Sequence, residues 1–176
     1  MNNKSKCEDF LKEQDMLSLP HRAKRLKFLV EKFGELQYIG LPQMAFYYFE
    51  GARLCYLNGT FAACVLIVQA ALEDILRSFF RFSGDDKITE LGFKGLIDEC
   101  LRKNLINEEE AINLHNVRKC RNPYVHTKDP MHPKGLIGRM QKSNFEKDDW
   151  DLMKEDAENA IICLFDFIKR HPFSIF

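Results

Sequence analysis

The sequence predicts an all-α protein, a compact bundle of about five to seven helices. Apolar residues recur at helical spacing along most of the 176-residue chain, and the alternation typical of strands is weak throughout. Hydrophobic residues make up 45% and charged residues 30% of the chain, the ordinary mixture of a folded globular protein. We therefore expect a single domain over residues 1–176, with an N-terminal helical extension in residues 1–41 and a core bundle in residues 43–170.

The first clear helix is predicted from about Leu19 to Phe33. Ser18 can cap its start, Pro20 suits its first turn, and Gly34 suits its end. The segment before it, Met1 to Asp15, is polar and lacks the apolar core of a signal peptide.

The stretch from Leu54 to Leu72 contains no charged residue over 19 positions, close to the length that spans a bilayer. The turn sequence Asn58-Gly59-Thr60 interrupts it, and such a turn inside a bilayer would leave backbone groups unpaired. We therefore expect two packed helices rather than a membrane span. The first follows Pro42 and stops at Asn58-Gly59, and the second runs from a Thr60 cap to about Phe82.

The second of these helices is expected to lie at the centre of the bundle, because its first two turns, residues 61–68, are apolar on every side. A shorter helix is expected around residues 93–101. The sequence Asn107-Glu108-Glu109-Glu110 resembles a capping box and predicts the start of a further helix, which ends near Arg121.

The last third of the chain is predicted to hold one loop and one helix. Residues Thr127 to Asn144 contain two prolines and two glycines and are expected to form a long loop. The final helix, from about Glu146 to Arg170, is expected to bury eight residues along one side: Trp150, Met153, Ala157, Ala160, Ile161, Leu164, Phe165 and Ile168.

Six cysteines lie far apart in the sequence, with no pair at the spacing of a zinc site. Several have apolar neighbours, as in Ala63-Cys64-Val65, which is typical of reduced, buried thiols. We therefore expect a cytoplasmic protein without a bound metal or cofactor.

The hexapeptide Arg121-Asn122-Pro123-Tyr124-Val125-His126 is the clearest candidate for chemistry. Arginine is a permanent cation whose planar donors suit phosphate oxygens, and histidine exchanges protons near neutral pH. Asn122 adds a neutral donor and acceptor. In a straight helix Arg121 and His126 would be about 140° apart around the axis. Either a kink at Pro123 or a second subunit is needed to bring two such groups together.

Basic residues gather around this hexapeptide, although the formal net charge of the chain is zero. Between Arg118 and Lys142 there are seven cations and one acid. Such an excess attracts a polyanion. The candidates for RNA contacts are Lys119, Lys128, Lys134 and Arg139, and the alternative is a solvated basic loop.

The Arg-x-x-x-x-His spacing, with Asn directly after the arginine, resembles the signature of the HEPN family of small all-helical domains. The context agrees with this resemblance. Ala70-Ala71-Leu72-Glu73 lies on the central apolar helix, Leu114-His115-Asn116-Val117-Arg118 precedes the hexapeptide, and an apolar helix closes the chain. The resemblance covers about Gln43 to Arg170.

The resemblance implies a metal-independent endoribonuclease that works as a homodimer, with a composite active site, in toxin–antitoxin, defence or stress-response systems. Arg121 would stabilise the phosphate, His126 would transfer a proton, and Asn122 would orient the reacting groups. Glu73 matches a position that is often acidic in the family and would support Arg121. The partners that the resemblance implies are RNA, a second copy of the chain and an antitoxin or regulatory protein.

Two alternatives remain open from the sequence. The first is a catalytically inactive HEPN-type module that binds nucleotides, RNA or a protein partner, and the second is a helical dimerisation scaffold. In a purely structural reading, Arg121 and His126 would act as cations that stabilise a helix C-terminus.

Overall fold

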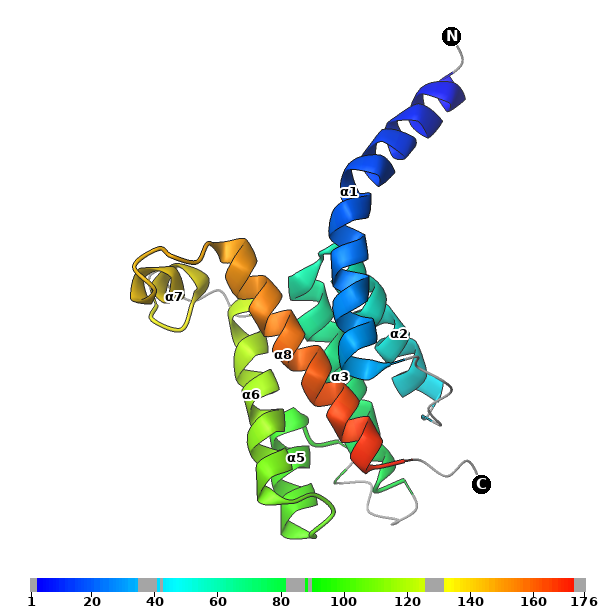
Figure 1. Ribbon diagram of the computed structural model, residues 1–176. Helices are drawn as coiled ribbons and strands as arrows, with labels where there is room; N and C mark the ends of the chain where they lie inside the picture. The colour runs from blue at the N-terminus through cyan, green and yellow to red at the C-terminus, as the bar shows by residue number, and fades with distance from the viewer. Residues whose placement is uncertain are drawn as a thin grey trace.

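The computed structural model describes residues 3–34, 41, 43–81, 88, 90–125 and 132–172. Within these residues it contains seven α-helices and no strand, so the prediction of an all-α bundle is confirmed (Figure 1). The helices are α1 (Asn3–Phe33), α2 (Gln43–Asn58), α3 (Phe61–Ser78), α5 (Phe93–Arg102), α6 (Glu108–Val125), α7 (Leu136–Lys142) and α8 (Asp149–Arg170).

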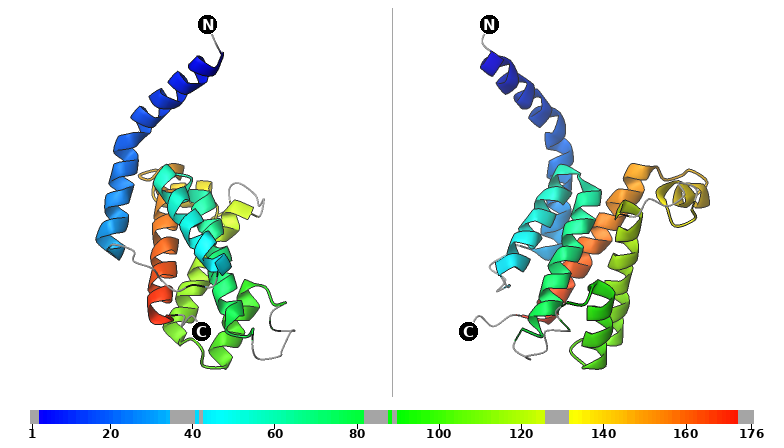
Figure 2. Two further views of the ribbon diagram at one scale, coloured as in Figure 1. Left: turned by 90° about the vertical axis from the view of Figure 1, so that its right-hand side faces the viewer. Right: turned by 180° about the vertical axis from the view of Figure 1, so that it is seen from behind.

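Helix α3 is the centre of the bundle, as its all-round apolar sequence predicts. It packs against α2, α5, α6 and α8 (Figure 2). Half of its residues are buried: Phe61, Cys64, Val65, Val68, Gln69, Ala71, Leu72, Ile75 and Leu76. Gln69 is the one polar side chain in that set, and its Oε1 has no hydrogen-bond partner among the described residues.

The predicted break between α2 and α3 is confirmed. Gly59 has a φ of +80°, a conformation that glycine adopts without strain. The Thr60 N–H and hydroxyl both donate to the Cys55 carbonyl, at 2.9 and 3.0 Å, so this hydroxyl closes α2 and does not cap α3. No helix among the described residues combines the length and apolar character that crossing a bilayer requires.

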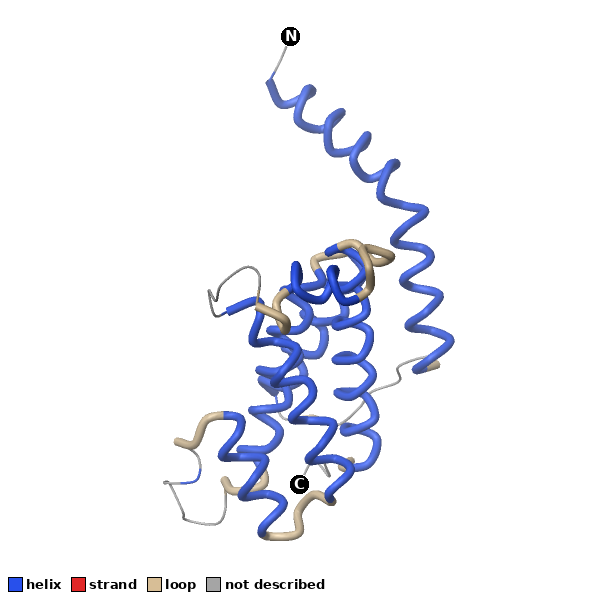
Figure 3. The backbone as a smooth tube through the Cα atoms, turned by 90° about the vertical axis from the view of Figure 1, so that its left-hand side faces the viewer, coloured by secondary structure: helices blue, strands red, loops and turns tan. Residues whose placement is uncertain are grey.

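Helix α1 begins at Asn3, so the start predicted at Leu19 is wrong. The helix continues through Pro20, which removes only the bond its N–H would have donated to the Met16 carbonyl, and Met16 is 76% exposed. Residues 6–17 are all exposed, and this half projects beyond the bundle (Figure 3). The second half is packed, since Leu29 and Phe33 are buried.

The capping box at the start of α6 is confirmed by reciprocal bonds of 2.9 Å between Asn107 and Glu110. Helix α6 continues past Arg121, near which its end was predicted, and reaches Val125 with Pro123 inside it. The carbonyl of Lys119, which loses its partner at this proline, belongs to an exposed residue, so water can hydrate it.

The expectation of a long loop from Thr127 to Asn144 is wrong for part of that range, because residues 136–142 form α7. A turn precedes this helix, with the Gly135 N–H donating to the His132 carbonyl at 2.7 Å. Gly138 lies against the backbone of this turn, where a Cβ would overlap the His132 carbonyl and come within 2.7 Å of the Pro133 Cα. The glycine therefore allows α7 to fold closely onto the turn.

Helix α8 buries the predicted stripe with one exception. Ala157, Ala160, Ile161, Leu164, Phe165 and Ile168 are buried, and Met153 is partly buried. Trp150 was expected in the core but is 50% exposed. It lies in the first turn of the helix, at the edge of the bundle, where its ring meets Phe61 edge-on at 5.0 Å between centroids.

Candidate functional site

The hexapeptide lies at the C-terminal end of α6. Arg121 and Asn122 are both partly buried there. With the other described residues, the Arg121 guanidinium forms no hydrogen bond or ion pair. His126 and Lys128, which were predicted to transfer a proton and bind RNA, lie outside the described residues.

The register of α6 places Arg121 on the core-facing side of this helix. Arg121 follows the buried Val117 by four residues, one turn further along the core-facing side. His115 lies on the neighbouring side of α6, with its Nε2 3.3 Å from Asp98 of α5. Arg118 and Asn122 follow His115 along that side. Arg118 has a buried Nε without a partner among the described residues. Two arginines and an asparagine therefore follow one another along this part of α6.

Glu73 was expected to support Arg121. Its ion pair instead joins it to Arg77, one turn further along α3, at 3.3 Å. Arg77 also reaches the Leu91 carbonyl at 3.4 Å, just before α5. No ion pair or hydrogen bond joins Glu73 to Arg121 in the described structure.

Three of the four basic residues expected to contact RNA are described, and they lie in different environments. Lys119 and Lys134 are exposed. Arg139 is instead held by Asp156, with its Nη1 2.6 Å from Oδ2 and its Nη2 2.8 Å from Oδ1. Both terminal nitrogens of Arg139 are therefore occupied inside the protein.

Asp156 is the most buried charged residue of the described chain, at 3% exposure. In addition to Arg139, it accepts a hydrogen bond of 2.6 Å from the Tyr124 hydroxyl, which belongs to the hexapeptide. Burial and this bond raise the pKa of Tyr124 above its usual range, and the bonds to Asp156 raise the pKa of Arg139. Burial and the charge of Asp156 raise the pKa of the nearby Cys120 to about 11. We call the set Asp156, Tyr124 and Arg139 the Asp156 cluster.

Sequence reasoning missed this cluster, although one signal was available. Asp156 lies in the buried stripe of α8, four residues after Leu152 and four before Ala160. A carboxylate in such a stripe requires donors from elsewhere in the fold. Its partners are 32 and 17 residues away in the chain, so nothing in the local sequence identifies them.

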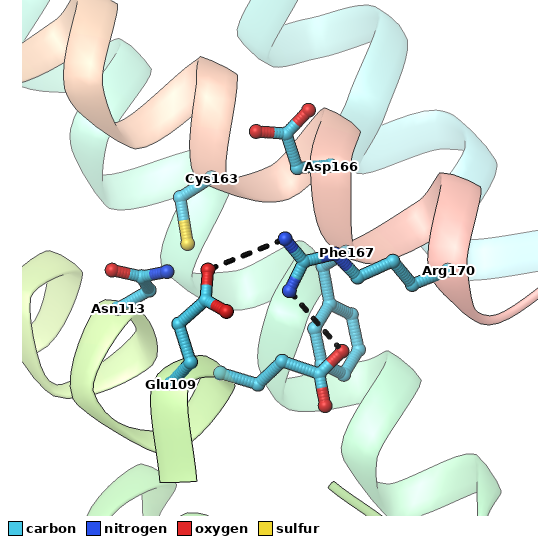
Figure 4. Close-up of a pocket in the computed structure, with 7 residues that line it drawn as sticks. Glu109, Asn113, Cys163, Asp166, Phe167 and Arg170 are labelled. Carbon is cyan, nitrogen blue, oxygen red and sulfur yellow. Dashed lines mark hydrogen bonds and ion pairs between the residues drawn. The ribbon is translucent and has the colours of Figure 1, made fainter. Parts of the chain in front are cut away.

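A groove runs between α6 and α8. Its larger hollow, of about 320 Å³, is lined by Asn113, Asn116, Val117, Cys120, Asn159, Ala160, Ile162, Cys163 and Asp166. A smaller hollow of about 80 Å³ adjoins it and shares Asn113, Cys163 and Asp166 (Figure 4). There Arg170 pairs with Glu109 at 3.3 Å. No lysine or arginine lines the larger hollow, so its character is polar but not cationic.

No group of three or more His, Cys, Asp or Glu side chains in the described part of the chain is arranged to hold a metal ion. The six cysteines are all unpaired thiols. Cys64 and Cys100 are buried, and burial raises the pKa of each to about 12.

Comparisons with protein-family models, with curated proteins and with solved structures found no match for this chain. The fold and the side chains described above are therefore the basis for a functional proposal.

Proposed function

We propose that this protein is a metal-independent endoribonuclease of the HEPN type. The observation that carries the proposal is the position of Arg121, partly buried beside Asn122 near the end of α6 and without an ion-pair partner among the described residues. An unpaired guanidinium next to an amide is suited to receive a phosphate from outside.

The proposed reaction uses the nucleophile that RNA carries. The 2′-hydroxyl attacks the adjacent phosphorus and the 5′-oxygen leaves, which gives a 2′,3′-cyclic phosphate and a 5′-hydroxyl. His126 moves the proton, Arg121 stabilises the charge on the phosphate, and Asn122 orients the groups. Lys119 and Lys134 attract the backbone of the RNA.

A composite site in a homodimer fits the sequence spacing. Arg121 and His126 diverge by about 140° on a regular helix, so residues from two subunits combine more readily than residues from one. The family resemblance also motivates a role in toxin, defence or stress response, under the control of an antitoxin or regulatory protein.

The test is cleavage of end-labelled RNA by the full chain in EDTA. We expect cleavage with a cyclic phosphate product, a loss of about 10² to 10³ in rate for Arg121→Ala, and a loss of about 10² to 10⁴ for His126→Ala. Arg102→Ala is the matched control, because it removes an exposed cation of α5 that pairs with Glu99. Equal cleavage by the Arg121→Ala and wild-type proteins, or cleavage of DNA, would contradict the proposal.

Mixing two inactive variants tests the composite site. If each site takes Arg121 from one subunit and His126 from the other, an Arg121→Ala/His126→Ala heterodimer contains one intact site. Activity should then return on mixing and subunit exchange. A mixture that stays inactive, although heterodimers form, would show that one subunit supplies both residues.

A non-catalytic RNA-binding module is the second candidate. The observation that favours it is that Lys119 and Lys134 are exposed and available to an RNA backbone, whereas Arg139, another cation expected to contact RNA, is held by Asp156. Salt-sensitive RNA binding without any cleavage product would identify this function.

A further inference from the structure

The Asp156 cluster connects three elements that the chain order separates. Tyr124 lies in the last turn of α6, Arg139 lies in α7, and Asp156 lies in α8. In the sequence, Tyr124 and Arg139 stand on either side of residues 126–131. A single carboxylate thus fixes the described chain before and after that stretch.

We propose that Asp156 is a positioning residue for the RNA-cleaving site: through Tyr124, in the last turn of α6, it sets the orientation of the end of this helix, where Arg121 lies. This inference rests on the proposed function. Tyr124 is three residues after Arg121, so both side chains belong to the same helical turn, and a rotation of that turn moves both.

The bonds within the cluster account for this role. Oδ2 accepts from both Tyr124 and Arg139, at 2.6 Å each, and Oδ1 accepts from Arg139 at 2.8 Å. Charge-assisted bonds of this length are the stronger kind in proteins, and the paired guanidinium bonds fix an angle as well as a distance. The last turn of α6 needs such a tie, because Pro123 has removed one of its backbone bonds.

Asp156 does not qualify as a catalytic residue. It is 3% exposed, and both of its oxygens already have donors, so it does not reach a substrate. The phenol of Tyr124 is likewise committed to this carboxylate, and its raised pKa keeps it protonated. The effect of the cluster on chemistry is therefore indirect, through the geometry of α6.

The chain contains a matched control for this idea. Tyr56 of α2 donates a hydrogen bond of 2.7 Å to Glu158 of α8, two residues after Asp156. Tyr56 is fully buried. Its bond to Glu158, like that of Tyr124 to Asp156, is a tyrosine–carboxylate bond that joins another helix to α8. It does not involve α6. Tyr124→Phe and Tyr56→Phe each remove one hydroxyl from an equivalent bond and keep the ring.

The experiment measures kcat, KM and melting temperature of the two variants with the same RNA. Both are expected to melt below the wild type by a similar amount. Tyr124→Phe is expected to lower kcat by about 10- to 100-fold with KM within about twofold, the size of effect that misplacing a reacting group by about 1 Å produces. Tyr56→Phe is expected to keep kcat within about twofold. Arg139→Lys, which retains the charge but not the paired geometry, should lie between Tyr124→Phe and the wild type.

Three outcomes decide the matter. A kcat loss confined to the Tyr124 and Arg139 variants supports the inference. Equal kcat for all variants, or an equal loss in Tyr56→Phe, overturns it while the proposed function stands. A wild-type protein that does not cleave RNA overturns the proposed function and the inference with it. Hydrogen exchange adds a readout independent of activity, since Tyr124→Phe should speed exchange at the end of α6 and Tyr56→Phe should not.

Discussion

The two ends of the α6–α8 pair each bury one carboxylate, and the two are held differently. At the start of α6, Glu110 exchanges bonds with Asn107, three residues earlier, and meets His171 at 2.9 Å beyond the end of α8. Toward the other end, Asp156 accepts hydrogen bonds from Tyr124 and Arg139, which are 32 and 17 residues away in the chain.

The two ends also differ in how exposed the arginine beside each carboxylate is. Arg170, the cation beside Glu110, keeps 46% of its side chain exposed, so water can solvate it if the carboxylate is lost. Arg139 keeps 25% and has both terminal nitrogens bonded to Asp156. The Glu110 end therefore mainly caps a helix, and the Asp156 end joins α7 to α8 through the one ion pair described between these two helices.

The largest effect should come from removing the carboxylate of the Asp156 end. Asp156→Ala leaves a partly buried guanidinium without its counterion, and breaking such a buried pair lowers the free energy of unfolding by about 3 to 5 kcal/mol. Glu155→Ala is the control, since its pair with Lys147 is half exposed and should contribute about 0 to 1 kcal/mol. Urea unfolding measures both, and equal losses would remove the distinction between buried and exposed pairs here.

Gly138→Ala tests the close approach of α7 at the same end. The added methyl group meets backbone that cannot move aside, so we expect a loss of about 1 to 3 kcal/mol. Gly51→Ala provides the contrast in α2, because its methyl group would meet Ile67 at an ordinary 3.6 Å. That variant should gain about 0.5 to 1 kcal/mol from helix propensity. A stable Gly138→Ala protein would show that α7 can shift freely.

Glu110→Ala should be milder than Asp156→Ala. It removes the capping-box bond and exposes Arg170 and His171 to water, and such caps contribute about 0.5 to 2 kcal/mol. The double variant with Asn107→Ala should lose less than the sum of the two single losses, because both remove the same reciprocal bonds. A loss as large as that of Asp156→Ala would erase the difference between the two ends.

Thiol reactivity gives the smallest and most local comparison. The pKa of Cys120 is raised to about 11, and burial raises that of Cys163, which lines the smaller hollow beside Glu109 and Arg170, to about 12. A thiol whose pKa is higher in the folded than in the unfolded state stabilises the fold at pH values below its ordinary pKa, near 8.5. This contribution decreases above that pH and is lost as pH rises through the folded-state pKa, about 11 for Cys120. At pH 8 alkylation of Cys120 should be about 100-fold slower than in urea. Asp156→Ala should speed alkylation of Cys120 but not of Cys163, as peptide mass spectrometry can resolve.

The parts of the fold that the sequence predicted are those with local signals. The capping box at Asn107 and Glu110 spans three residues, the turn at Gly59 needs only one glycine, and α3 is recognisable from a continuous apolar run. Each depends on neighbours in the chain, so one sequence is enough to find it.

The parts that were missed depend on distant contacts or misleading local ones. Helix α7 has only seven residues, too few to be stable alone, and it is supported by the bond from Arg139 to Asp156. Ser18 and Pro20 resemble a helix start, although the helix passes through them. Within the candidate site, the position of Arg121 on α6 was predicted, but the role of Tyr124 depends on a residue 32 positions away.

Helix α1 has two halves that are stabilised differently. Its second half is anchored by Leu29 and Phe33, whereas residues 6–17 have no side chain buried against the bundle. Starting a helix is the costly step and extending it is not, so the packed half acts as a nucleus from which the outer turns propagate. The outer half therefore depends on the packed half for its helical structure, and each turn toward the N-terminus is less stable than the one before it. A partner surface that covered Phe10 and Leu17 would stabilise these outer turns.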